Sequence, residues 1–441
     1  MVSYVLTKVA VTVYAGGLVF QQVFGIKELW GIDFFWIAAI GLVVLTALYT
    51  IFGGMKSVLY TSVLQTPILL LGSLIILVLG FKELGGWDEM MRVCGAVTVN
   101  DYGDTMTNLI RSNDDANFPW LGALIGSAII GFWYWCTDQF IVQRVLSGKN
   151  EMEARRGTIF GAYLKLLPVF LFLIPGMIAF ALHQKYIGAG GEGFLPMLEN
   201  GTANADAAFP TLVAKLLPAG VKGLVVCGIL AALMSSLASL FNSSAMLFTI
   251  DFYKRFRPQT SEKKLVGIGQ VATVVIVILG ILWIPIMRSV GDVLYTYLQD
   301  VQSVLAPGIA AAFLLGICWK RTSAQGGMWG LISGMVIGLT RLGAKVYYSN
   351  AGEVADSTFK YLFYDMNWLF FCGWMFLFCI IVVIVVSLAT EAPTAEKIQG
   401  LVFGTATKEQ KASTRASWNH WDIIHTVIIL AITGAFYWYF W

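Results

Sequence analysis

Charged residues are scarce in this sequence. Asp, Glu, Lys and Arg make up 12% of its 441 residues, whereas hydrophobic residues make up 58%. A soluble domain carries about 25% charged residues because its surface must face water. So few charges cannot cover a water-facing surface of this size. The composition therefore excludes a soluble globular protein and predicts a chain surrounded by lipid.

Metal-binding and catalytic patterns are also lacking. The three histidines and six cysteines show neither HExxH nor CxxC spacing, which argues against a zinc site. We find no nucleophile–base pair, so no enzyme and no cofactor are predicted. The net charge of +3 is spread without a basic stripe, so no nucleic-acid partner is expected. The cysteines lie mostly in apolar segments and are expected to pack as small hydrophobes.

Long apolar segments dominate instead. A helix needs about 20 mostly apolar residues to cross a bilayer, and its backbone groups must be paired internally. The sequence predicts an all-α integral membrane protein with eleven spans, at residues 2–24, 33–52, 57–81, 119–141, 157–183, 219–250, 265–287, 292–318, 325–347, 368–389 and 423–440.

The loops between these segments predict an orientation. Four loops are rich in Lys and Arg, and they alternate with loops that lean acidic. Since basic loops stay in the cytoplasm, we expect a multi-pass protein of the cell inner membrane with Trp441 outside. We expect one transmembrane domain over residues 1–441, with 390–421 as a long, mobile cytoplasmic loop. Residues 211–217 are expected to form an interfacial helix.

Two charged residues stand out within the apolar segments, where charge usually marks function. Asp138 follows an aromatic run, but it lies close enough to Arg144 to cap or pair at the cytoplasmic end of its span. Lys165 lies just before Pro168. It is either part of a binding site or a lysine whose amine reaches the interface. The residues alone leave both questions open.

Oxygen and amide groups lie on two further spans. Ala232, Ser235 and Ser236 are spaced to share one helix face. A carbonyl freed by a local distortion and two hydroxyls would suit Na+, although spacing alone favours close helix packing. Gln299 could bind a polyol hydroxyl as donor and acceptor. The run Trp133-Tyr134-Trp135 could stack on a sugar or belong to an interfacial belt.

Taken together, these motifs resemble the sodium–solute symporter family, in its sodium/glucose cotransporter branch. The resemblance covers nearly the whole chain. It is strongest at Trp-Tyr-Trp-Cys-Thr-Asp-Gln (133–139), Ile-Val-Gln-Arg (141–144), Gly-Ala-Tyr-Leu-Lys-Leu (161–166) and Pro-Gly-Met (175–177), with further matches at 48–54, 233–237, 241–243, 248–251, 311–313 and 319–321.

The resemblance implies a LeuT-like fold of inverted repeats, with substrate near the midplane between discontinuous helices. It implies that Tyr134 contacts substrate and forms the inner gate, that Trp135 lies beside the sugar, and that Lys165 and Gln299 contact it. It also implies that Ala232, Ser235 and Ser236 bind sodium, which reverses the interpretation from spacing. The expected activity is sodium-coupled symport of a glucose- or galactose-like monosaccharide.

The sequence departs from the family pattern at three places. About three helices are expected before the first span, so the chain looks like an N-terminally truncated member. A second sodium site in some relatives uses an Asp and a hydroxyl where this sequence has Ser62 and Ala238, so one sodium per sugar is expected. Gly131 replaces a sugar-binding side chain. The alternatives are therefore a symporter of myo-inositol or another polyol, or a non-transporting sugar sensor. The oligomeric state is not predicted.

Overall fold

The computed structural model describes residues 2–198, 201–288, 294–350 and 355–440. Within these ranges, the side chains of residues 2–7, 49, 51–58, 61, 286–288, 294, 296–297 and 350 are left out of the description. Trp441, whose outside position the sequence predicts, lies outside the described residues.

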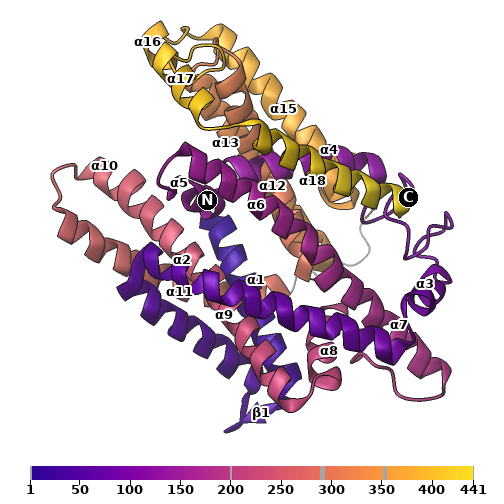
Figure 1. The fold of residues 1–441 in the computed structure, drawn as a ribbon. Coiled ribbons are helices and arrows are strands. Elements are labelled where there is room, and N and C mark those ends of the chain that lie inside the picture. Colours follow the sequence, from indigo (N-terminus) through magenta and orange to yellow (C-terminus); the bar gives the residue numbers. More distant parts are fainter. Residues whose placement is uncertain (1, 199–200, 289–293, 351–354, 441) are drawn as a thin grey trace. The chain divides into compact units, whose positions relative to one another are not determined.

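The described chain is almost entirely helical (Figure 1). A two-stranded antiparallel hairpin, β1 (Glu28–Leu29) and β2 (Ile32–Asp33), joins the first two helices. The long helices are α1 (Val2–Phe24), α2 (Phe34–Leu84), α4 (Trp120–Cys136), α6 (Glu151–Pro168), α7 (Ile174–Gly188), α9 (Ala219–Met246), α11 (Glu262–Arg288), α12 (Leu294–Cys318), α13 (Ala324–Asn350), α15 (Trp368–Ala389) and α18 (His420–Tyr439).

Shorter helices connect or extend them. The α-helices are α3 (Trp87–Gly95), α5 (Gln139–Leu146), α8 (Ala208–Leu216), α10 (Lys254–Phe256), α14 (Thr358–Lys360), α16 (Ala395–Ile398) and α17 (Lys408–Ala416). Three π-helices, η1 (Val169–Leu173), η3 (Leu247–Tyr253) and η4 (Tyr361–Asp365), and one 3-10 helix, η2 (Ala205–Ala207), complete the set. The predicted helix at 211–217 is found as α8. The predicted loop 390–421 contains the short helices α16 and α17.

Among the described residues, seven helical runs are long and apolar enough to cross a membrane, or eight if the bent pair α4 and α5 forms one span. The other predicted spans are helical as well, in α1, the first part of α2, and α13. Length and composition therefore make this a multi-pass membrane protein.

Helix α2 differs from the prediction of two separate spans at 33–52 and 57–81. It is one helix of 51 residues, which would measure about 76 Å if straight, far more than the ~30 Å of a hydrocarbon core. Its apolar parts are Phe34–Leu48 and Ser62–Leu84. Gly53 and Gly54 between them do not end the helix, because glycine costs only about 1 kcal/mol in a helix interior and does not remove a hydrogen bond.

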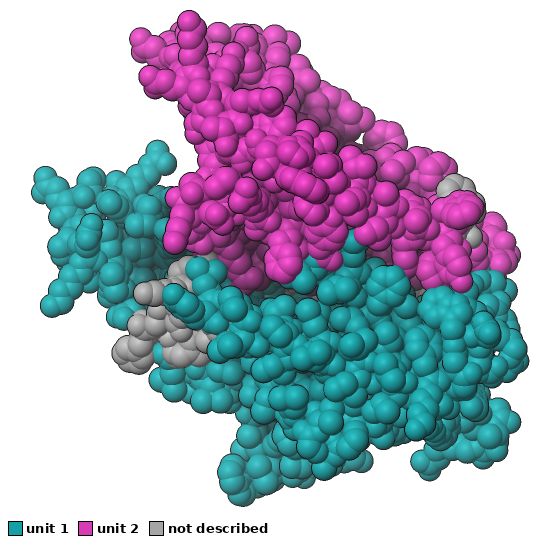
Figure 2. All heavy atoms as spheres, in the orientation of Figure 1, with its two compact units in different colours: residues 1–99, 105–107, 164–295 teal, residues 100–104, 108–163, 296–441 magenta. Residues whose placement is uncertain are grey.

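The chain divides into two compact units, coloured separately in Figure 2. Unit 1 contains residues 1–99, 105–107 and 164–295, and unit 2 contains 100–104, 108–163 and 296–441. The single domain predicted over residues 1–441 stays a prediction.

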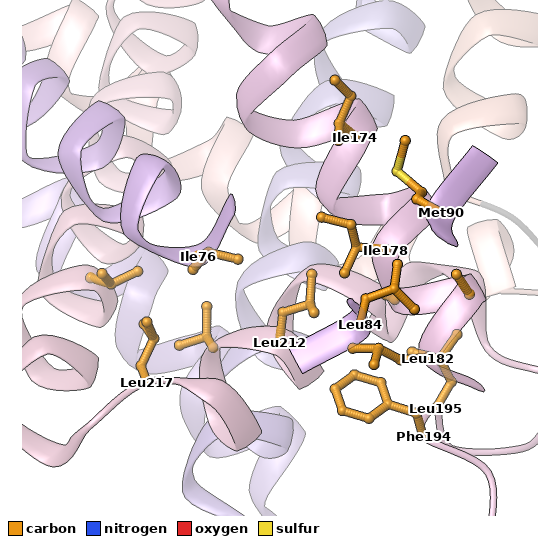
Figure 3. Packing of buried hydrophobic residues seen from close by; sticks show 14 of the residues in the cluster. Ile76, Leu84, Met90, Ile174, Ile178, Leu182, Phe194, Leu195, Leu212 and Leu217 are labelled. Atoms are coloured by element: carbon orange, nitrogen blue, oxygen red, sulfur yellow. The ribbon is translucent and has the colours of Figure 1, made fainter. Parts of the chain in front are cut away.

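Unit 1 has its own buried core, which Figure 3 shows from close by. Leu84 from α2, Met90 from α3 and Leu212 from α8 meet Ile178 and Leu182 from α7, and all five are at most 1% exposed. Burying such side chains stabilises by about 1.5–3 kcal/mol each. This core holds the end of α2 against α7 and α8. Helix α9 packs along α2.

In unit 2, a row of glycines on α13 lets α12 and α15 approach this helix closely. Gly326, Gly330, Gly334 and Gly338 follow one face of α13 at intervals of four residues. A Cβ atom on Gly334 would lie 3.0 Å from the Cα atom of Gly308 in α12, and one on Gly338 would lie 2.8 Å from the carbonyl oxygen of Val304. Small residues at this spacing are typical of packed membrane helices.

Two alanine substitutions on α13 are expected to shift stability in opposite directions. Gly338→Ala would push a methyl group against the backbone of α12, at a cost of about 1–3 kcal/mol. In the described part of the chain, no atom beyond the adjacent backbone of α13 itself lies within 4 Å of the Cβ position of Gly327, so Gly327→Ala should stabilise the helix by up to about 1 kcal/mol. Thermal unfolding of the detergent-purified proteins measures both. A midpoint for Gly338→Ala at or above that of Gly327→Ala would contradict the proposed close packing.

Candidate functional site

A break between two helices of unit 2 forms the centre of the candidate site. Helices α4 and α5 together have the length and composition of one span, but they meet at a bend of 46°. The N–H groups of Thr137 and Asp138 both donate to the carbonyl of Trp133, at 3.0 and 3.1 Å, and end α4. Asp138 then starts α5, because its carboxylate accepts the N–H of Phe140 at 3.2 Å. Such a side chain satisfies one of the open donors of a helix start.

Asp138 is therefore a capping residue, as one of the two interpretations of the sequence had it. It is 5% exposed, and its cap fixes the direction in which α5 leaves the break. The span is discontinuous at the position where the family resemblance implies that substrate binds.

Tyr134 and Trp135 lie in the last turn of α4, directly before this break. Their rings meet edge to face, with centroids 5.3 Å apart. Trp133 is 3% exposed, whereas the Trp135 side chain is 51% exposed. Within unit 2, Trp133 thus anchors the helix and Trp135 presents a large aromatic surface.

Gln299 lies in the first half of α12 and is half-buried. It belongs to unit 2, as Tyr134 and Trp135 do, whereas Lys165 belongs to unit 1. The structure therefore places three of the four predicted sugar-contacting residues in one unit. Their roles stay predictions.

Lys165 lies near the end of α6 and is exposed. Three residues later Pro168 ends the α-helix, and the chain continues as the π-helix η1 before α7 begins. Proline cannot donate the hydrogen bond that an α-helix needs, and π-helical turns occur frequently at functional sites. The predicted span 157–183 is therefore distorted just beyond Lys165.

The predicted sodium ligands lie on one face of a regular helix in unit 1. Helix α9 runs without interruption from Ala219 to Met246. Ser235 is 7% exposed, and Ala232 and Ser236 are half-buried. The expected local distortion at Ala232 is absent, since α9 stays helical there. The Ala232 carbonyl could bind a cation only through its second lone pair.

A hydroxyl from α2 meets this face. The Oγ atoms of Ser62 and Ser235 lie 2.6 Å apart and form a hydrogen bond. The Ser239 hydroxyl also donates to the Ser235 carbonyl at 3.0 Å. Ala238, one turn away, is fully buried and offers no side-chain oxygen. Ser62 and Ala238 are the positions at which the family resemblance implies an Asp and a hydroxyl in some relatives. Here they supply one neutral hydroxyl, which is bonded to Ser235.

Sequence reasoning missed a group of charges in unit 2. Asp300 in α12 lies 2.5 Å from the Lys345 amine and 3.6 Å from the Arg341 guanidinium, both on α13. Each residue falls within a predicted span, at 292–318 or 325–347. The rule that charge within an apolar span marks function would therefore have found them. Among the described residues, no group of three or more His, Cys, Asp and Glu side chains could hold a metal ion.

Comparison with known proteins decides the family. The model of the "Sodium:solute symporter family" matches residues 1–334. The chain belongs to this family.

Three similar relatives of this symporter-family chain are cotransporters by name. Sodium/myo-inositol cotransporter 2 of Homo sapiens is 36% identical over 413 residues, which are 91% of this chain and 60% of the relative. A sodium/mannose cotransporter of Bos taurus is 35% identical, over 99% of this chain and 75% of the relative. Sodium/glucose cotransporter 4 of Mus musculus is 35% identical, over 92% and 60%. The chain thus spans about 60% of the length of the myo-inositol and glucose relatives.

A solved structure confirms the fold. The substrate-bound outward-open state of a Na+-coupled sialic acid symporter aligns with a TM-score of 0.64 at 20% sequence identity, over 89% of this chain and 74% of that chain. The predicted LeuT-like fold class is confirmed for this family member, and transporters rather than enzymes are its relatives.

Proposed function

We propose that this chain acts in sodium-coupled symport of a glucose- or galactose-like monosaccharide, with one sodium ion carried per sugar. The observation that carries the proposal is the break between α4 and α5, which places Tyr134 and Trp135 at the end of a discontinuous membrane helix. Membership in the symporter family supports the sodium coupling. The names of the relatives include glucose, mannose and myo-inositol, so myo-inositol or another polyol is the rival substrate.

The proposed sugar site uses three kinds of contact. The exposed face of Trp135 stacks on the apolar face of the sugar ring. The Gln299 amide both donates to and accepts from sugar hydroxyls, and the Lys165 amine donates a charge-assisted hydrogen bond. Each of these proposed contacts suits a ring with several hydroxyls.

The proposed sodium site uses the face of α9 that carries Ala232, Ser235 and Ser236. These three oxygens are fewer than the six or so that a hard cation takes, so the remaining ligands must come from another helix. The stoichiometry of one rests on Ser62 and Ala238. A neutral hydroxyl bonded to Ser235 and a methyl group lack the negative charge that a second cation would require.

Coupling follows from shared ordering of the site. Sodium binding organises the discontinuous helix, so sugar then binds with less loss of conformational freedom. The membrane potential contributes about 2.3 kcal/mol per charge at 100 mV, and each 1.4 kcal/mol is tenfold. One sodium ion therefore supports about 40-fold accumulation before its own gradient is counted. Tyr134 moves aside as the inner gate and releases the sugar to the cytoplasm.

Uptake by the protein in cells or liposomes tests this proposal. Labelled glucose, galactose, mannose, myo-inositol and sialic acid are offered with and without sodium, and the charge moved per substrate is recorded. We expect sodium-dependent uptake of a monosaccharide with one charge per molecule. Two charges would overturn the stoichiometry, and preference for myo-inositol would overturn the sugar. Binding without uptake would identify a sensor.

A further inference from the structure

A buried carboxylate next to Gln299 ties α12 to α13. Asp300 is 7% exposed and Arg341 is 1% exposed, and both lie in the apolar interior of unit 2. Charged groups are rarely removed from water without partners, because desolvation disfavours the charged form. The partners of these residues therefore show what the cluster holds together.

Arg341 connects α13 to three neighbouring elements. One guanidinium nitrogen donates to the carbonyl of Met366 at 2.7 Å, and the other donates to the carbonyl of Leu362 in η4 at 3.4 Å. The guanidinium also lies over the ring of Phe371 in α15, 4.1 Å from its centroid. Toward α12 it faces the Asp300 carboxylate at 3.6 Å. The Arg341 side chain is thus held on several sides and cannot shift without breaking these contacts.

Lys345 approaches the same carboxylate from the next turn of α13. Its amine donates to Oδ2 of Asp300 at 2.5 Å. Residues four apart lie on one helix face, so α13 holds Asp300 from two successive turns. Two contacts at different heights restrict both the rotation and the axial position of α12, which a single contact could not do.

This restriction determines where the neighbouring residue points. Successive residues of an α-helix differ by about 100° in direction, so when the Asp300 side chain faces α13, Gln299 faces elsewhere. Any turn of α12 would move the Gln299 amide by the same angle. Direct sugar contacts lose strength when their donors and acceptors are misplaced by about 1 Å.

We propose that Asp300, held by Arg341 and Lys345, is a positioning residue that sets the orientation of Gln299 for substrate. The proposal rests on the proposed function, since it takes Gln299 as a sugar contact. Asp300, Arg341 and Lys345 thus contribute to the specificity for a hydroxyl-rich ligand as well as to the stability of the fold.

Uptake by substituted proteins tests the role. Asp300→Asn should raise the sugar concentration for half-maximal uptake about tenfold, or ~1.4 kcal/mol, with little change in the sodium requirement at saturating sugar. The pair Asp300→Asn with Lys345→Gln removes one negative and one positive charge, so it keeps the net charge of the cluster and guards against failure to fold. It should show the same loss, and Asp300→Glu should recover most of the affinity.

Gln299→Ala separates positioning from a structural role. If Asp300 acts through Gln299, adding Asp300→Asn to Gln299→Ala should weaken sugar affinity no further, since residues that act together are not additive. Full additivity would overturn the proposal. Asp356→Asn is the control, because it makes the same change in an ion pair of the same unit. Asp356 pairs with Lys360, and its side chain is 95% exposed. It should leave uptake unchanged.

A labelling experiment keeps this test independent of transport. Gln299→Cys is treated with a maleimide, and the modified peptide that contains residue 299 is quantified by mass spectrometry. Adding the charge-balanced pair should change the labelling rate severalfold, while adding Asp356→Asn should not. An unchanged rate overturns the positioning role. A changed rate supports positioning even if the unsubstituted protein shows no sodium-dependent uptake, and that absence of uptake would refute the proposed function alone.

Discussion

Ser235→Ala is expected to raise the sodium concentration for half-maximal uptake by at least about tenfold. The substitution removes one of three proposed oxygen ligands on α9. Loss of even an outer partner of a metal ligand typically costs about 10- to 100-fold in affinity. It also leaves the Ser62 hydroxyl without the partner that it has at 2.6 Å. Uptake recorded across a series of sodium concentrations measures the effect.

Ser244→Ala is a closely matched control for this experiment. Ser244 lies on the same helix and is 7% exposed, as Ser235 is, but its hydroxyl donates within the helix, to the carbonyl of Leu240 one turn earlier, at 2.7 Å. We expect its sodium dependence to stay near that of the unsubstituted protein. If Ser235→Ala and Ser244→Ala give the same sodium dependence, Ser235 does not bind the coupling ion.

Lys165→Ala is expected to weaken sugar affinity by about 10- to 100-fold. A hydrogen bond from a charged group contributes about 1.5–3 kcal/mol, and each 1.4 kcal/mol is tenfold. Lys165 is exposed and lies shortly before the π-helix η1. The concentration of sugar for half-maximal uptake measures the loss, with sodium kept saturating.

The same variant distinguishes the two interpretations of this lysine. If the Lys165 amine only reaches the membrane interface, Lys165→Ala should lower the amount of protein in the membrane while the remaining protein binds sugar normally. Arg156→Ala, an exposed cation on the same helix, controls for loss of positive charge near the predicted cytoplasmic end. Unchanged sugar affinity in Lys165→Ala would remove this residue from the site.

Several features of the site were predictable because they depend on residues close in sequence. The aromatic run before Asp138 is visible in the sequence, and capping by that aspartate was one of two interpretations left open. The distortion after Pro168 was not predicted, although it follows from the local backbone chemistry of proline. The regular spacing of Ala232, Ser235 and Ser236 likewise predicts one shared face, which the uninterrupted helix α9 has. The freed carbonyl at Ala232 was not found, since the helix needs no distortion to bring these residues to one face.

Contacts between distant residues were not predictable in the same way. Spacing does not pair Ser62 with Ser235, which are 173 residues apart. The family resemblance brings Ser62 near α9, at Ala238, but it does not predict the hydrogen bond to Ser235. The ion pairs of Arg341 and Lys345 with Asp300 were not predicted, although each of the three charges lies in a predicted span. Periodicity predicts which residues share a helix, but it does not predict which face of one helix meets which face of another.

The sequence by itself determined the membrane environment, the helical class and the family of this protein. It did so because the shortage of charge and the length of the apolar segments leave few alternatives, and because the motifs are specific. Only the tertiary structure decided that α4 and α5 bend by 46° at the Asp138 cap, that one hydroxyl of α2 faces the α9 serines, and that a buried ion cluster holds α12. These arrangements depend on packing between segments far apart in the chain, where many weak contacts together select one register.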